Sequence, residues 1–237
     1  MMRRSEHILR MAASAVRHVF IGDVHGCLDE LNALLRKVGV TRDDRVVFVG
    51  DLVAKGPDSA GVVARARELN SVCVRGNHDE AVLRIRRARQ QGSDLPRAKK
   101  THLRVAERLR EPDWRWLETL PLYLHFPELD RIVVHAGVVP GKPLEKQHPE
   151  DLMTMRTLRP EGTGSPRLED GTLWARSYPG PTQVIFGHDA ISGLQRHPFA
   201  TGIDTGCVYG RELTALILPS NELVSVTARR AYRELDR

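Results

Sequence analysis

Short apolar runs along the chain alternate with segments in which leucine and valine recur every three or four positions. Runs at 17–21, 45–49 and 71–74 predict three strands. Leu28, Leu31, Leu34, Leu35 and Val38 follow the first strand at helical spacing, and a second helix is expected from 59 to about 69. This order of strands and helices is typical of an α/β protein.

The next segment, from 80 to about 118, has a helical pattern and is strongly basic. Between 84 and 110 there are ten lysines or arginines and two acids. The stretch 90–96 contains glycine and proline, so we expect two helices that form an inserted cap. The charge has two interpretations: a solvated helical face, or a surface that attracts a polyanion.

Strands are predicted again in the second half of the chain. Apolar runs at 131–134 and 183–186 indicate two of them, and 140–181 between them is rich in proline, glycine and charge. Only short ordered pieces such as 151–156 are expected there. The alternating runs 213–218 and 223–227, joined by a polar connection, predict a β-hairpin.

Polar residues gather where the predicted strands end. The strings are GDVHG (22–26), GDLVAKGPDS (50–59), RGNHD (75–79), HAG (135–137) and GHD (187–189). In open α/β sheets, ligands bind at the carboxyl ends of the strands. The candidate site therefore consists of Asp23, His25, Asp51, Asn77, His78, His135 and His188.

This set mixes carboxylates, imidazoles and one amide oxygen, which suits divalent Mn, Fe, Co or Zn. Two metals roughly 3.5–4 Å apart need a bridging carboxylate, and Asp51 is the best placed candidate. Such a pair lowers the pKa of a bound water to about 7 and polarises phosphoryl oxygens. The pattern therefore predicts in-line hydrolysis of a phosphoryl group.

The five strings, in this order, resemble the signature of the phosphoprotein-phosphatase (PPP) superfamily of calcineurin-like metallophosphoesterases, from Phe20 to about Leu218. The resemblance implies an α/β sandwich of two mixed β-sheets flanked by helices. It implies that Asp23, His25 and Asp51 hold one metal, and that Asp51, Asn77, His135 and His188 hold the second. It also implies that His78 is the general acid, which together with Asp51 makes up the catalytic pair.

Departures within the motifs indicate a branch. Protein Ser/Thr phosphatases of the superfamily usually carry GDxVDRG and GNHE, whereas Ala54 here replaces the aspartate that would orient the histidine acid, and Lys55 replaces an arginine. Asp79 is the candidate substitute for that aspartate. GDLVAKGP, GNHD and the segment 202–210 resemble ApaH-like phosphatases, which are similar to symmetrical bis(5'-nucleosyl)-tetraphosphatases.

Several residues outside the metal motifs are candidates for the substrate. Lys55, Arg75, Arg156 and Arg176 are predicted to bind phosphate, with a surface ion pair as the alternative for the first two. Trp174, Tyr178 and Tyr209 are candidates to stack a base, although buried core is the favoured role of Trp174. Surface or core roles are expected for the histidines outside the motifs, His7, His18, His102, His125, His148 and His197.

The favoured function is hydrolysis of phosphoanhydrides with two divalent metals, Mn first. The favoured substrate is diadenosine tetraphosphate, giving two ADP; a nucleotide-capped RNA 5' end and inorganic polyphosphate are related candidates. The alternative is a Ser/Thr phosphoprotein phosphatase. A third hypothesis is a non-catalytic scaffold or RNA-binding protein, which the complete ligand set disfavours.

Composition indicates the charge of the substrate, the domain organisation and the compartment. The chain has 237 residues, of which 41% are hydrophobic, and a net charge of +6, which favours an acidic substrate. We expect one domain over 17–237, after an Arg-rich leader at 1–16 that is either disordered or an organelle-targeting segment. Three cysteines without CxxC spacing favour a reducing, cytoplasmic setting. No apolar run approaches the ~20 residues that span a bilayer, and the sequence leaves the oligomeric state open.

Overall fold

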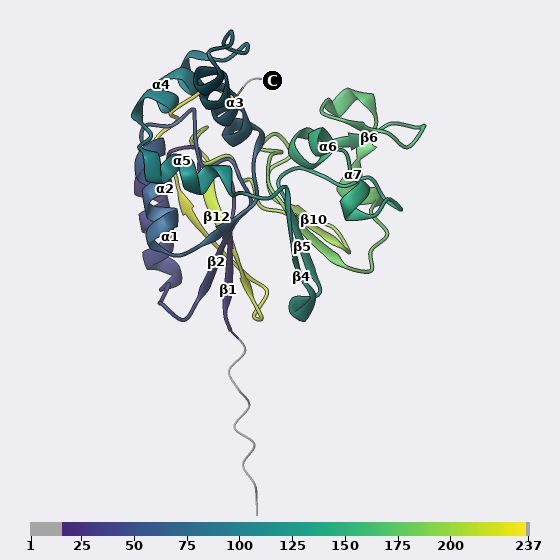
Figure 1. Cartoon of the computed structure of the whole chain (residues 1–237). Coiled ribbons are helices and arrows are strands. Elements are labelled where there is room, and N and C mark those ends of the chain that lie inside the picture. Colours follow the sequence, from purple (N-terminus) through teal and green to yellow (C-terminus); the bar gives the residue numbers. More distant parts are fainter. Residues whose placement is uncertain (1–15, 236–237) are drawn as a thin grey trace, which may run out of the picture.

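Two β-sheets lie face to face with helices outside them in the computed structural model, which describes residues 16–235 (Figure 1). The expected leader falls, up to residue 15, outside the described residues. Helices α1 and α2 cover the outer face of the first sheet, and the segment that carries α6 and α7 lies beside the second. The sandwich architecture expected from the motifs is confirmed.

The first sheet has the strand order β13-β12-β1-β2-β3. Strands β1, β2 and β3 are parallel, whereas β12 runs antiparallel to β1 and forms a hairpin with β13, as predicted. The sheet is therefore mixed. Its strands are β1 (His18–Ile21), β2 (Arg45–Phe48), β3 (Val72–Cys73), β12 (Glu212–Leu218) and β13 (Glu222–Thr227).

The second sheet has the order β10-β11-β9-β5-β4 and is also mixed, because β5, β9 and β11 are parallel and the outer strands are antiparallel. Its strands are β4 (Tyr123–Phe126), β5 (Arg131–Val134), β9 (Gln183–Phe186), β10 (Gln195–Arg196) and β11 (Ala200–Gly202). A small third sheet contains β6 (Thr157–Leu158), β7 (Gly164–Ser165) and β8 (Thr172–Leu173).

Alternation along each strand divides the core into layers, since successive side chains of a strand point to opposite faces. Val19 and Ile21 of β1 pack toward the helices, whereas Phe20 belongs to the cluster between the sheets, together with Val133 and Ile185 of the second sheet. Both faces of the central strands are therefore buried. This explains why these strands appear in the sequence as continuous apolar runs.

Helices α1 (Leu28–Val38) and α2 (Ser59–Glu68) begin directly after the first two strand-end motifs. The apolar stripe that predicted α1 is the face that it buries. Asp58 caps α2, since its carboxylate accepts the Gly61 N–H at 2.8 Å. Because each motif is held between a buried strand and a packed helix, its polar residues have a fixed position.

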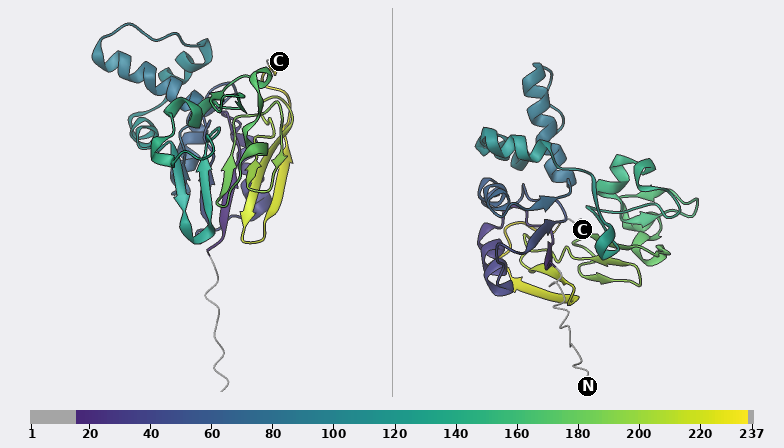
Figure 2. Two further views of the ribbon diagram at one scale, coloured as in Figure 1. Left: turned by 90° about the vertical axis from the view of Figure 1, so that its right-hand side faces the viewer. Right: turned by 60° about the horizontal axis from the view of Figure 1, so that its bottom comes forward.

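Three helices, rather than two, occupy the basic segment: α3 (Asn77–Gln91), α4 (Lys100–Arg108) and α5 (Glu111–Glu118). The break at 92–99 is as expected. The second break follows from Pro112, which lacks an N–H and is tolerated in the first turn of a helix but not in its interior. Leu83, Ile85 and Leu117 share one core cluster with α1 and α2, so these helices pack onto the sandwich (Figure 2).

The segment 140–181 has little regular structure, as its composition indicated. Its helices are short: α6 (Pro149–Thr154), α7 (Trp174–Ser177) and two 3-10 turns, Leu144–Lys146 and Leu168–Asp170; a third such turn, Pro127–Leu129, joins β4 to β5. Within 16–235, every helix falls short of the length and apolar character that crossing a membrane requires.

Candidate metal centre

The ends of four strands and the start of α3 bring the candidate ligands together. Strands β1 and β2 of the first sheet end next to β5 and β9 of the second, and the motifs follow directly. Within this cluster, Asp23, Asp51 and His135 offer ligand atoms that all lie within 4.8 Å of one another, and so do His25, Asp51 and His78. These two groups of three residues share one member, Asp51.

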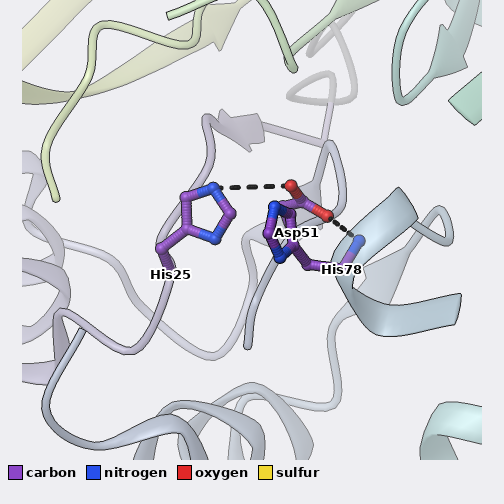
Figure 3. Close-up of side chains that lie close together, drawn as sticks. All are labelled: His25, Asp51 and His78. Carbon is purple, nitrogen blue, oxygen red and sulfur yellow. Dashed lines mark hydrogen bonds and ion pairs between the residues drawn. The ribbon is translucent and has the colours of Figure 1, made fainter. Parts of the chain in front are cut away.

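The two carboxylate oxygens of Asp51 have different partners (Figure 3). Oδ2 lies 3.4 Å from His25 Nε2 and 3.5 Å from His135 Nε2. Oδ1 accepts the backbone N–H of His78, in the first turn of α3, at 2.9 Å. The positive end of the helix dipole favours a carboxylate at this place. Asp51 thus presents one oxygen between two imidazoles, which is the position of a bridging ligand.

Backbone carbonyls orient the two imidazoles that flank Asp51. The Nδ1 of His25 lies 3.0 Å from the carbonyl oxygen of Val53, and the Nδ1 of His135 lies 2.8 Å from that of Val49. A neutral ring that donates from Nδ1 has its lone pair on Nε2, and this outer hydrogen bond is what fixes metal-binding histidines. The Nε2 atoms of both rings therefore face the cluster.

Asn77, His188 and Asp23 complete the cluster. Asn77 Oδ1 lies 3.1 Å from His135 Nε2 and 3.2 Å from His188 Nδ1. The backbone N–H of His188 donates to both oxygens of Asp23, at 3.2 and 3.3 Å. Nε2 of His188 is buried and makes no hydrogen bond to any described residue. A buried ring nitrogen without a partner is unusual and fits a site that holds an additional group.

Two glycines allow this close packing of backbone and carboxylate. A Cβ on Gly187 would lie 2.1 Å from Asp23 Oδ1, and one on Gly76 would lie 2.2 Å from Asp51 Oδ1. These glycines belong to the GHD and GNHD motifs. They are required there because any side chain would displace a ligand carboxylate.

Three buried carboxylates, Asp23, Asp51 and Asp204, give the site its negative charge. Burial raises the pKa of Asp23, and the neighbouring carboxylate of Asp204 raises it further. Burial also opposes ionisation of Asp51, but the neighbouring imidazole of His135 holds its pKa well below the usual range. Although burial lowers the pKa of His135, the carboxylates of Asp51 and Asp23 raise it to about 10. A cluster of buried carboxylates and imidazole nitrogens fits a pair of divalent cations.

Lys55 reaches the cluster from the second motif. Its Nζ lies 2.7 Å from His25 Nε2. Burial, together with the ammonium of Lys55, lowers the pKa of His25 to about 3, so this ring is neutral. The chain thus places a cation beside the metal ligands, which agrees with its expected role near phosphate.

A cavity of about 300 Å³ opens over the cluster. Lys55 and Arg156 both line it, as expected of phosphate-binding residues. Tyr209 also lines it, and the Nζ of Lys55 lies 5.2 Å from the centre of its ring. Asp204 is a lining residue that the sequence analysis did not single out, although its segment, 202–210, was part of the resemblance.

The other two phosphate candidates lie elsewhere. Arg75 forms an ion pair with Glu80 at 3.1 Å and donates to the Glu118 carbonyl oxygen, so the ion-pair alternative applies. Arg176 is exposed on α7. Trp174, two residues earlier, is buried and donates to the Ala136 carbonyl oxygen at 3.1 Å. Arg176 is not among the residues that line the cavity.

His102 is the site residue that the sequence analysis missed, since it was expected to have a surface or core role. Its Nε2 lies 2.8 Å from Nδ1 of His78. The prediction that Asp79 substitutes for the missing aspartate was wrong, because its carboxylate accepts backbone N–H groups of the second and third motifs, whereas the partner of the His78 ring is His102. His102 lies 24 positions from His78 on another helix, so no local pattern could indicate the contact.

The arginines at the start of the basic segment are paired with acids. Arg84 and Arg87 contact Glu80, and Arg86 contacts Glu111 and Glu118. Their charge is therefore largely compensated within the helices. Among the described residues of the segment, Arg104 and Arg108 of α4 form no ion pair.

The comparisons with known proteins agree with this geometry. The sequence model of the family described as calcineurin-like phosphoesterase matches residues 16–224. The chain belongs to this family. It is therefore a hydrolase of the metallophosphoesterase type, and the cluster around Asp51 contains candidate ligands for the family's dinuclear divalent-metal centre.

Similar proteins include two enzymes named bis(5'-nucleosyl)-tetraphosphatase PrpE (asymmetrical). The one from Oceanobacillus iheyensis is 31% identical over 90% of this chain and 92% of its own length. The one from Bacillus subtilis is 34% identical over 90% of this chain and 96% of its own length. Both are named asymmetrical, so they lend no support to the symmetrical branch that the motifs resembled.

A solved structure described as a candidate diadenosine tetraphosphatase is 35% identical, has a TM-score of 0.82, and covers 91% of this chain and 95% of its own. A protein serine/threonine phosphatase from Saccharomyces cerevisiae is 17% identical with a TM-score of 0.57, covering 93% of this chain and 82% of its own. The second likeness shows the shared fold.

Asp79→Asn tests how the motifs are held together. The Asp79 carboxylate accepts N–H groups of Asp51, Leu52, Val53 and Gly76, at 2.9, 3.2, 3.4 and 3.0 Å. An amide replaces one acceptor oxygen by a donor. We expect the free energy of unfolding to fall by about 2–3 kcal/mol, which lowers Tm by roughly 5–10 °C for a chain of this size.

Thermal unfolding of the metal-free variant, with metal content measured separately, checks this. The exposed Asp94 makes no interaction with another described residue, so Asp94→Asn is the matched control and should leave Tm unchanged. Equal Tm values for the two variants would show that Asp79 does not hold the motifs in place.

Proposed function

We propose that this chain hydrolyses the phosphoanhydride bonds of bis(5'-nucleosyl) tetraphosphates with two divalent cations, Mn²⁺ first among them. The observation that carries the proposal is the position of Asp51, whose Oδ2 lies between His25 and His135 at 3.4 and 3.5 Å on the floor of a basic cavity. Asp23 and His25 complete one metal position with Asp51. Asn77, His135 and His188 complete the other.

When bound, the metal pair supplies a nucleophilic water at neutral pH and withdraws charge from the phosphoryl oxygens. The side chains supply the rest. Asp51 holds the pair together, Lys55 and Arg156 bind the remaining phosphate oxygens, and His78 delivers a proton to the leaving oxygen. General acid catalysis of this kind contributes about 10²–10⁴ in rate.

The cavity favours a polyanion over a single phosphoserine. Lys55 and Arg156 line it, and a basic helix borders it. The names of the relatives favour a dinucleoside tetraphosphate and asymmetrical cleavage, whereas the motif resemblance favours the symmetrical position. A nucleotide-capped RNA end and inorganic polyphosphate offer the same chemical groups, so they belong in the test.

Product analysis decides among these substrates. Mn²⁺-loaded protein is incubated with diadenosine tetraphosphate, and in parallel with polyphosphate, a dinucleotide-capped RNA and a phosphopeptide; all products are resolved by chromatography. We expect turnover of the dinucleotide. ATP with AMP shows asymmetrical cleavage, and two ADP show symmetrical cleavage. Turnover of the phosphopeptide alone would instead support the Ser/Thr phosphatase.

Asp51→Asn is the matched inactive variant for that experiment. The amide keeps the shape of Asp51 but removes the charge that two cations share. We expect loss of at least one metal per chain and a fall in kcat of at least about 10³-fold, of the size seen when a main electrostatic contribution is removed. Near-normal turnover with both metals retained would contradict the assignment of Asp51 as the bridging ligand.

His102 is assigned as a positioning residue for His78. The Lys99 backbone N–H donates to His102 Nδ1 at 3.3 Å, and His102 Nε2 lies 2.8 Å from His78 Nδ1. This contact fixes the His78 ring and leaves its Nε2 for the substrate. This contact performs the orienting task of the aspartate that Ala54 replaces.

His102→Ala tests this role through the leaving group. We expect kcat for diadenosine tetraphosphate to fall about 10- to 100-fold, the usual cost of losing a residue that orients a functional side chain, with little change in KM. Hydrolysis of p-nitrophenyl phosphate should fall less, because its leaving group needs no proton. His102→Gln places an amide N–H near Nε2 and should restore most activity. An equal loss on both substrates, without rescue, would show a structural role only.

A further inference from the structure

A second cavity lies beside the catalytic one, also of about 300 Å³. It is bounded by the loop before α2, by α4 and by the C-terminal segment. None of its described lining residues is acidic, and four are basic: Lys55, Arg104, Arg108 and Arg230. Thr101 and Tyr232 supply polar hydroxyl groups to the same lining.

The two cavities adjoin each other along three segments. Lys55 lines both. Lys99 lines the catalytic cavity and Thr101, two residues later, lines the second one; in the same way Leu235 lines the first and Tyr232 the second. A chain of phosphates bound at the metal cluster therefore has a continuous basic path past Lys55 into the second cavity.

Helix α4 presents this cavity with one face and the catalytic site with another. Thr101, Arg104, Val105 and Arg108 all line the cavity, and their spacing of three and four residues places them on one helix face. His102 lies next to that face and contacts His78. The same helix thus fixes the general acid and carries the cations of the cavity.

Two of the arginines have no compensating acid. Arg104 and Arg108 make no hydrogen bond or ion pair with any residue between 16 and 235, unlike the paired arginines of α3. They are four positions apart on the helix, and like charges at that spacing destabilise a helix slightly. An anion bound between them removes this repulsion.

Tyr232 is held in place at the end of the cavity. Its hydroxyl donates to Glu30 Oε1 at 2.9 Å, and the guanidinium of Arg230 lies 5.2 Å from the centre of its ring. This end of the cavity therefore combines a fixed aromatic ring with a cation. Such a pair suits the far end of a nucleotide, where an aromatic base follows the phosphates.

We propose that this second cavity binds the part of the substrate beyond the scissile bond, a nucleoside with its remaining phosphates, with Arg104 and Arg108 as the phosphate-binding residues. The inference rests on the proposed function and adds a specificity site to it. It explains how the chain distinguishes a long dinucleotide from a small phosphate monoester, which reaches only the metal cluster and Lys55.

The test uses the double variant Arg104→Gln, Arg108→Gln in the full-length, Mn²⁺-loaded protein. Glutamine has nearly the helix propensity of arginine, so α4 should remain folded. The matched control is Arg36→Gln, Arg42→Gln, which removes the same charge from exposed positions outside both cavities.

We expect KM for diadenosine tetraphosphate to rise at least about tenfold in the first variant and less than twofold in the control. Turnover of p-nitrophenyl phosphate should be unchanged in both. An equal KM for the two double variants would overturn the inference.

A binding measurement separates this inference from the proposed function. The probe is a diadenosine tetraphosphate in which methylene groups replace the bridging anhydride oxygens, so it binds without being cleaved. We expect calorimetry to show at least about tenfold weaker binding to the Arg104→Gln, Arg108→Gln variant than to the control. Weaker binding to this variant, in a protein that does not turn over diadenosine tetraphosphate, would reject the proposed function and support the binding role of the second cavity. Equal affinity would reject the cavity, whatever the turnover.

Discussion

The carboxylate of Asp51 is the interaction on which the rest of the site depends. One oxygen accepts the first-turn N–H of His78 on α3, and the other lies between the imidazoles of His25 and His135. A single side chain thereby contacts residues that follow the first sheet, residues that follow the second sheet, and the helix that carries His78. Burial opposes its charge, yet the neighbouring imidazole of His135 keeps its pKa low. It is available as an anion where two cations are needed.

The fold brings the ends of four strands to one place. Two mixed sheets pack through the layer around Phe20, and both sheets present the ends of parallel strands at the same edge. Glycines at 76 and 187 let backbone approach the ligand carboxylates more closely than any side chain would allow. Asp79 then ties the second motif to the third through backbone N–H groups. The geometry of the centre is therefore set by buried, rigid parts of the chain.

Much of this could be predicted from the sequence, because strands buried on both faces and glycine-framed ligand motifs leave local patterns. The predicted strands and the hairpin are observed within a residue or two of their expected ends. The number of helices in the basic segment was wrong because Pro112 starts a new helix where a continuous basic pattern suggested one. Arg75 pairs with Glu80 at the start of α3 and Arg176 is exposed on α7, and the motifs do not encode either arrangement.

The contact between His102 and His78 is a clearer example of a contact that no local sequence pattern indicates. It joins two helices across 24 positions and follows no spacing rule, and Ala54 indicated only that something was missing. With His102 in this position, helix α4 contacts His78 on one side and lines a basic cavity on another. Most of the arginine charge on α3 is compensated by acids, so the basic composition of the segment acts through α4.

Anomalous diffraction from crystals of the Mn²⁺-loaded protein tests the central claim most directly. Asp51 as the shared ligand predicts two anomalous peaks roughly 3.5–4 Å apart, both within bonding distance of the Asp51 carboxylate, one beside Asp23 and His25 and the other beside Asn77, His135 and His188. A single peak, or two peaks of which one lies away from Asp51, would contradict the account.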